Sequence, residues 1–167
     1  MVDVAEKSVS ARKAVAAGRV VTTDEVLTAL RDNVLPKGDA MATARLAGIM
    51  GAKRTSELIP LCHPIGLHHV GVDLEVSSTA VEITATTRTA DRTGVEMEAL
   101  TAVAVAGLTL IDMIKSADPA AELTDVRVLS KTGGKTGHWE RLCAPKSSSP
   151  HSAQRQAYML TAADRCS

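Results

Sequence analysis

The feature that most constrains the fold is a long apolar segment with charged residues at both of its ends. It begins Thr-Gly-Val-Glu-Met-Glu-Ala-Leu-Thr at residues 93–101 and ends Ile-Asp-Met-Ile-Lys at residues 111–115, with only Ala, Val, Gly, Leu and Thr between them. Thr93 followed by Glu96 matches a capping box, the signature of a helix start. We therefore predict one long core helix that begins near Thr93 and ends at Lys115 or shortly after. Charges beside buried apolar surface are costly, so we expect those at its ends to have partners or a function.

Two shorter helices are predicted before this one. Thr22 with Glu25 three residues later forms another capping box and opens a helix that runs to about Asp32. Asp39 is a preferred N-cap residue, and the apolar residues after it recur at helical spacing until about Arg54.

Strands are predicted from the alternation or enrichment of apolar residues. The segments that show it are residues 14–22, 68–76, 81–85 and 124–129. With the helices, they give the order β-α-α-β-β-α-β along the chain. This order is typical of an α+β fold and fits a ferredoxin-like (split β-α-β) antiparallel sheet with helices packed on one face.

The length of 167 residues allows one domain with a core and is too short for two. Residues 1–12 are polar and lack a clear period, so we predict an N-terminal arm. After Trp139 the composition turns to Ser, Pro, Ala and Gln and the hydrophobic periodicity ends. We expect residues 142–167 to form a flexible C-terminal tail.

Charge and composition exclude several classes of partner. The 19 Lys and Arg residues balance 19 Asp and Glu residues, so no net field favours nucleic acid or an anionic membrane. No segment approaches the ~18 uncharged apolar residues of a membrane span, and none resembles a targeting peptide, so we expect a cytoplasmic protein. Cys62, Cys143 and Cys166 are odd in number and widely separated, which predicts neither a disulfide framework nor a metal site.

The Gly-Lys-Thr sequence at residues 134–136 resembles the end of a phosphate-binding P-loop. The P-loop pattern fails because Leu129 stands where it requires glycine, and no helix pattern follows. A Gly-Gly turn flanked by Lys131 and Lys135 can still hold phosphate through backbone amides. The alternative is an ordinary surface turn.

Three charged residues near helix ends are candidates for a site. Lys37 stands two residues before the Asp39 N-cap, where a bound anion would meet both the helix dipole and an ammonium. Asp112 and Lys115 are spaced to share one helix face. On spacing alone, a solvated lysine and an exposed ion pair are the favoured explanations.

Cys62 and His63 lie between two prolines in a segment without regular structure. Adjacent residues in extended backbone seldom point together, so Cys62 suits a buried small side chain better than a nucleophile with His63 as its base. Glu96 is explained by the capping box, whereas Glu98 has no structural explanation in the sequence. Glu98 is therefore the stronger site candidate.

Several blocks in fixed order resemble the cyclic pyranopterin monophosphate synthase (MoaC) family of molybdenum cofactor biosynthesis. The resemblance runs from Met-Val-Asp-Val at the start of the chain and covers roughly residues 1–141, which we take as the domain. The blocks that carry it, besides the two ends of the long helix, are Lys-Gly-Asp-Ala-Met-Ala-Thr-Ala-Arg at 37–45, Leu-Ile-Pro-Leu-Cys-His-Pro at 58–64 and Ser-Lys-Thr-Gly-Gly-Lys at 130–135.

The resemblance implies a lyase that converts (8S)-3′,8-cyclo-7,8-dihydroguanosine 5′-triphosphate to cyclic pyranopterin monophosphate and releases diphosphate. It puts Asp112 at the family's catalytic aspartate and Lys37 and Lys115 at its active-site lysines. We expect no cofactor and no metal site. The positions that it matches to substrate contacts are Leu61, Cys62, His63, Met97 and Glu98. With such a substrate, Lys131 and Lys135 would hold phosphate.

Glu98 and Asp112 are 14 residues apart, which is about 21 Å along a helix. Either the substrate is long, or two subunits contribute opposite ends of this helix to one site. The family resemblance implies the second, in a homo-oligomer, a hexamer built as a trimer of dimers with sites between subunits. Two alternatives remain: an enzyme of another class that forms a Schiff base through Lys115, and a non-enzymatic oligomeric nucleotide-binding module.

Overall fold

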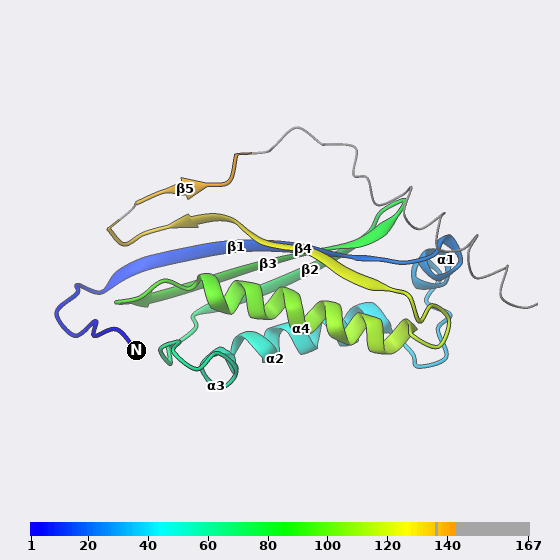
Figure 1. The fold of residues 1–167 in the computed structure, drawn as a ribbon, viewed down its shortest axis with the longest axis horizontal. Coiled ribbons are helices and arrows are strands. Elements are labelled where there is room, and N and C mark those ends of the chain that lie inside the picture. Colours follow the sequence, from blue (N-terminus) through cyan, green and yellow to red (C-terminus); the bar gives the residue numbers. More distant parts are fainter. Residues whose placement is uncertain (136, 143–167) are drawn as a thin grey trace, which may run out of the picture.

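Within the residues that the structure describes, an antiparallel sheet of five strands forms one layer (Figure 1). A computed structural model describes residues 1–135 and 137–142. The strands are β1 (Ser10–Val21), β2 (His69–Val76), β3 (Ala80–Asp91), β4 (Glu122–Thr132) and β5 (Trp139–Glu140). Their order across the sheet is β2-β3-β1-β4-β5. The first four positions have the predicted split β-α-β arrangement.

Helices α2 (Ala40–Ala52) and α4 (Glu96–Ile114) cover the same face of this sheet, as Figure 1 shows. The described residues also form the shorter helices α1 (Asp24–Arg31) and α3 (Thr55–Leu58). Helix α4 packs on β1, β3 and β4, while α2 packs on α4 and β2. The predicted α+β fold with helices on one face is thus confirmed.

Small residues let α2 lie very close to α4. A Cβ atom at Gly51 would come within 2.7 Å of Val105, and one at Gly48 would come within 2.8 Å of the main-chain oxygen of Ala102. The two helices run in opposite directions, because Lys37 before α2 contacts Asp112 near the end of α4, while Cys62 beyond α2 contacts Glu98 near its start. The packing therefore brings a different loop to each end of α4.

The core between the layers is aliphatic. Its largest fully buried side chains include Leu27, Ile83, Leu110 and Ile114. By length and composition α4 could cross a membrane, although we expected no segment to approach that composition. Half of its apolar window is buried within this protein, which is the behaviour of a core helix.

Two of the three predicted helix starts are wrong in detail. Asp39 caps α2 as predicted, because its Oδ1 accepts from the amide of Ala42 at 2.9 Å. Helix α1, however, is capped by Thr23, since the Thr22 hydroxyl donates to Asp118 at 2.7 Å. Among the described side chains none caps helix α4, because Glu96 pairs with a lysine of β4 instead.

Other boundaries also differ from the prediction. Strand β1 begins at Ser10, so the N-terminal arm is shorter than residues 1–12. Strand β3 continues to Asp91, and neither α3 nor β5 was predicted. The proposed tail lies outside the described residues from position 143 onward.

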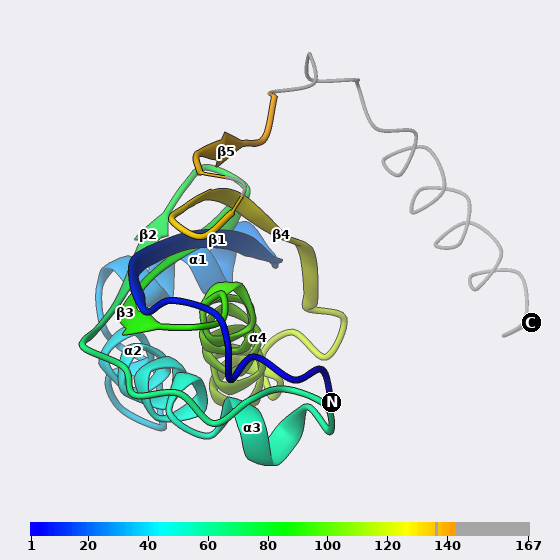
Figure 2. The ribbon, with the colours of Figure 1, turned by 90° about the vertical axis from the view of Figure 1, so that its left-hand side faces the viewer.

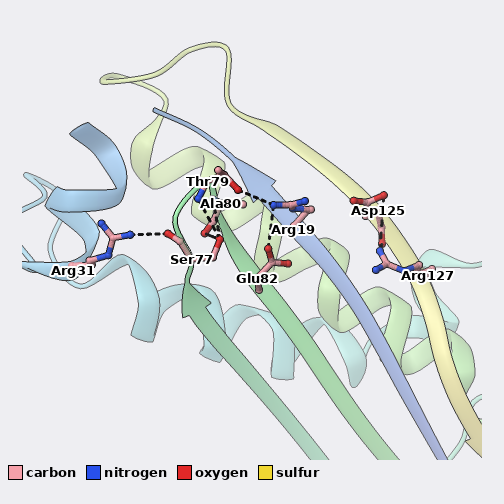
Figure 3. Close-up of polar contacts among 8 residues, drawn as sticks. All are labelled: Arg19, Arg31, Ser77, Thr79, Ala80, Glu82, Asp125 and Arg127. Carbon is pink, nitrogen blue, oxygen red and sulfur yellow. Dashed lines mark hydrogen bonds and ion pairs between the residues drawn. The ribbon is translucent and has the colours of Figure 1, made fainter. Parts of the chain in front are cut away.

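Polar contacts join β1 and α1 to the turn between β2 and β3 and to the first residues of β3 (Figure 3). Arg19 pairs with Glu82 at 3.2 Å and donates to the Thr79 hydroxyl at 3.1 Å. Arg31 of α1 donates to the main-chain oxygen of Ser77 at 2.7 Å. These contacts hold the hairpin between β2 and β3 against its neighbours, and they account structurally for charges that the candidate site does not use.

Candidate active site

Three predicted residues meet at the C-terminal end of α4. Lys37 Nζ lies 3.0 Å from Asp112 Oδ2, and Lys115 Nζ lies 2.6 Å from Asp112 Oδ1. Lys37 also donates to the main-chain oxygen of Asp112 at 2.6 Å. Main-chain carbonyls at a helix end lack intrahelical partners and carry the negative end of the dipole, so this end of α4 attracts both ammonium groups.

The carboxylate of this cluster is held in its charged form. Hydrogen bonds from Lys115 and then from Lys37 lower the pKa of Asp112 below its ordinary value. Two lysines share one carboxylate, which leaves a net positive charge, and all three side chains are at least two-fifths exposed. Such a cluster can bind an anionic group from solvent or exchange protons with it.

A buried carboxyl marks the N-terminal end of α4. Glu98 is 2% exposed, its Oε1 lies 3.8 Å from Cys62 Sγ, and its Oε2 has no hydrogen-bond partner among the described residues. Burial raises the pKa of Glu98. Burial, followed by the neighbouring Glu98, also raises the pKa of the Cys62 thiol, which disfavours the thiolate that a nucleophile needs.

His63 contacts the N-terminal segment, which passes close to α3 (Figure 2). Its Nε2 lies 2.8 Å from the main-chain oxygen of Val2. A carbonyl oxygen only accepts, so Nε2 carries the hydrogen, and in the neutral ring Nδ1 remains free to accept. Cys62 and His63 thus contact different partners, as expected for adjacent residues.

A cleft of about 470 Å³ separates the segment after α3 from the start of α4. Leu61, which is 71% exposed, and Met97 contribute apolar surface to it. The residues that line it are Ile59, Leu61, Cys62, His63, Thr93, Gly94, Glu96 and Met97. Apolar walls with a few polar groups are typical of sites for flat organic ligands.

The Gly-Gly turn after β4 lies beside this region. Lys131 Nζ is 2.8 Å from Glu96 Oε1, and Lys135 lines an open cleft of about 910 Å³ together with Arg12. A smaller cleft of about 120 Å³ contains Arg12, Lys131 and Lys135. Arg12, Lys131 and Lys135 thus lie around two clefts that share lining residues at this end of the sheet.

The structure collects the predicted residues in two clusters and not in one. The cluster at the N-terminal end of α4 contains Leu61, Cys62, His63, Met97, Glu98, Lys131 and Lys135. The cluster at the other end contains Lys37, Asp112 and Lys115.

Sequence reasoning missed Arg12, which it places in the arm. Its signal was the adjacent basic pair with Lys13, immediately before the predicted strand. It also missed the pairing of Glu96 with Lys131.

Fold and clusters together define a ferredoxin-like α+β protein that presents acid–base groups and cations at both ends of its core helix. The MoaC family model matches residues 1–134. The chain is 63% identical over 141 residues to a cyclic pyranopterin monophosphate synthase of Streptomyces coelicolor, covering 84% of this chain and 83% of that protein. It is 60% identical to cyclic pyranopterin monophosphate synthase 2 of Mycobacterium tuberculosis, at 84% coverage of each. For the Chloroflexus aurantiacus synthase, identity is 53%, over 84% of this chain and 88% of that protein. The chain belongs to the MoaC family.

Proposed function

We propose that this chain has the activity of its relatives, cyclic pyranopterin monophosphate synthesis in molybdenum cofactor biosynthesis. The substrate would be (8S)-3′,8-cyclo-7,8-dihydroguanosine 5′-triphosphate, and diphosphate would leave. The observation that carries this conclusion is the cluster of Lys37, Asp112 and Lys115, assembled from distant segments in a chain about 60% identical to synthases. The function is that of a lyase.

The cluster at the C-terminal end of α4 is assigned the proton transfers. An ionised Asp112 either positions both ammonium groups or deprotonates the substrate. Lys37 and Lys115 neutralise phosphate charge and exchange protons as the imidazole-derived ring opens and the pterin forms. The lowered pKa of Asp112 supports the positioning role, because the carboxylate stays charged between the two lysines and is a weaker base than an ordinary aspartate.

The cluster at the N-terminal end of α4 is assigned to holding the substrate. The apolar side chains of Leu61 and Met97 suit the faces of a flat ring. Oε2 of the buried Glu98 has no partner among the described residues and would suit a ring N–H donor that reached it, while His63 would orient a neighbouring polar group. The thiol of Cys62 hydrogen-bonds to Glu98 and serves as a contact, not as a nucleophile.

Phosphates are assigned to the cations beside the Gly-Gly turn. Lys131, Lys135 and Arg12 surround one small cleft. A triphosphate needs several cations, and a guanidinium can contact two phosphate oxygens at once.

The active site is proposed to be shared by two subunits. Glu98 and Asp112 lie in the same helix about 21 Å apart, too far for one compact reacting centre. Leu108 of α4 is 61% exposed, and Leu46 and Met50 of α2 are exposed as well. A second copy of the chain would cover such exposed apolar side chains of α2 and α4. We therefore propose a homo-oligomer, a hexamer formed as a trimer of dimers.

We propose the cytoplasm as the compartment of this soluble biosynthetic enzyme, because the free thiol of Cys62 suits reducing conditions.

The direct test of function is to incubate the purified protein with the cyclised GTP derivative and to follow pterin product and diphosphate. Equimolar formation of both is expected. Binding without turnover would support a nucleotide-binding module instead, and borohydride trapping of a carbonyl substrate on Lys115 would support the Schiff-base alternative.

A further inference from the structure

Two threonines of β3 are buried against the helix layer without taking part in the chemistry described above. Thr87 is 0% exposed and Thr89 is 4% exposed. A buried hydroxyl lowers stability unless it is hydrogen-bonded, and valine would fill either position with the same shape. Both hydroxyls donate to main-chain oxygens of loops, and each of these loops carries one wall of the 470 Å³ cleft.

Thr89 holds the wall that contains Leu61, Cys62 and His63. Its hydroxyl donates to the main-chain oxygen of Gly66 at 2.6 Å. Two residues further on, His68 is also attached to β3: its amide donates to Arg88 at 2.9 Å, and its Nδ1 accepts from Ala90 at 3.3 Å. The loop between α3 and β2 is thereby fixed three residues after His63.

Thr87 holds the opposite wall. Its hydroxyl donates to the main-chain oxygen of Val95 at 2.9 Å, and Val95 is the residue at which α4 begins, without a side-chain cap. Gly94 and Glu96 flank it and line the cleft, with Met97 one residue further. The hydroxyl of Thr87 therefore sets where the first turn of α4 stands.

The two anchors are alternate residues of one strand, which places them about 6.8 Å apart on the same face. We propose that Thr87 and Thr89 are positioning residues for the synthase reaction, each fixing one wall of the substrate cleft so that β3 sets its width. This inference rests on the proposed function and adds two residues to it. Neither hydroxyl touches the substrate; each acts through the loop that it holds.

The test compares Thr87→Val and Thr89→Val with the matching serine variants. Valine keeps the shape and removes the donor, whereas serine keeps the donor and removes a methyl group. Thr86→Val is the control, since Thr86 lies on the same strand, points to the other face and is only half-buried. For each variant, kcat and KM are measured, along with the free energy of unfolding and the alkylation rate of Cys62, followed by mass spectrometry of its peptide.

The valine variants are expected to lose roughly ten- to a hundredfold in kcat/KM, the scale of a small misplacement of reacting groups, and to alkylate faster at Cys62. Serine variants are expected to keep most of the activity even where they unfold more easily. Valine variants with parental kcat/KM and parental alkylation would overturn the proposal, as would activities that simply follow stability across all five variants. If the parent protein shows no synthesis at all, the proposed function fails, yet unchanged or faster alkylation of Cys62 still decides whether the threonines hold the cleft.

Discussion

Lys37 and Asp112 are 75 residues apart in the chain, yet Lys37 Nζ lies 3.0 Å from Asp112 Oδ2. The contact exists because α2 packs antiparallel on α4, which brings the loop before α2 to the end of α4. Lys115 completes the cluster from within α4 itself. The fold thus places two ammonium groups on one exposed carboxylate.

Asp112→Asn is expected to reduce synthesis by about 10²- to 10⁴-fold, the range of general acid–base catalysis, with little change in the free energy of unfolding. The shape is kept and the exposed side chain loses only its charge. Rates of product formation and denaturant unfolding curves measure the two effects. Asp125→Asn is the control, since Asp125 is an exposed carboxylate beside Arg127. A near-normal rate for the Asp112 variant would remove it from the chemistry.

Lys37→Ala and Lys115→Ala are each expected to lower kcat/KM far more than Lys53→Ala does. Lys53 is exposed and stands at the C-cap of α2, where a cation is favoured by the helix dipole alone. Steady-state kinetics of the three variants make the comparison. Similar losses in all three would mean that general surface charge, and not the cluster, attracts the substrate.

Glu98 makes stability depend on pH in a direction that can be measured. Burial raises the pKa of Glu98 in the folded protein above its ordinary value, so the folded state holds a proton that the unfolded state releases first. The contribution of Glu98 to stability is therefore complete below the unfolded pKa and is lost as pH rises through the folded pKa. The free energy of unfolding of the parent protein should fall as pH rises from the unfolded-state pKa of Glu98 to its folded-state pKa. Glu98→Gln should make this fall smaller. An identical decline in parent and variant would show that Glu98 is not the group responsible.

Removing residues 146–167 is expected to leave synthesis and assembly unchanged. The segment lacks hydrophobic periodicity, and the family match ends at residue 134. Activity assays and the mass of the truncated oligomer provide the check. Loss of the folded domain on truncation would mean that the tail packs against it.

Local signals predicted the elements well and their exact ends less well. The Asp39 cap depends only on residues within one turn, and the alternation of β2 and the apolar length of α4 are equally local. The two capping boxes failed because tertiary partners competed for the same side chains: Asp118 binds Thr22, and Lys131 binds Glu96. Such competition is invisible in a window of a few residues.

The candidate site was predicted to a different degree at each end of α4. The contact of Asp112 with Lys115 follows from helical spacing and is confirmed at 2.6 Å. The contact of Glu98 with Cys62 joins residues 36 positions apart, and it depends on the packing of α2 and α3 against α4. Arg12 was missed because strand β1 begins earlier than the polar composition of its first residues suggested.

We propose that one active site combines the two ends of α4 from different subunits. Glu98→Ala and Asp112→Asn proteins, each inactive alone, are mixed under conditions that exchange subunits, and mass spectrometry first establishes that mixed oligomers have formed. The shared site predicts that synthesis returns in the mixture, because one interface then contains Glu98 from one chain and Asp112 from the other, while its twin carries both lesions. Mixed oligomers that form and remain inactive would contradict the shared site.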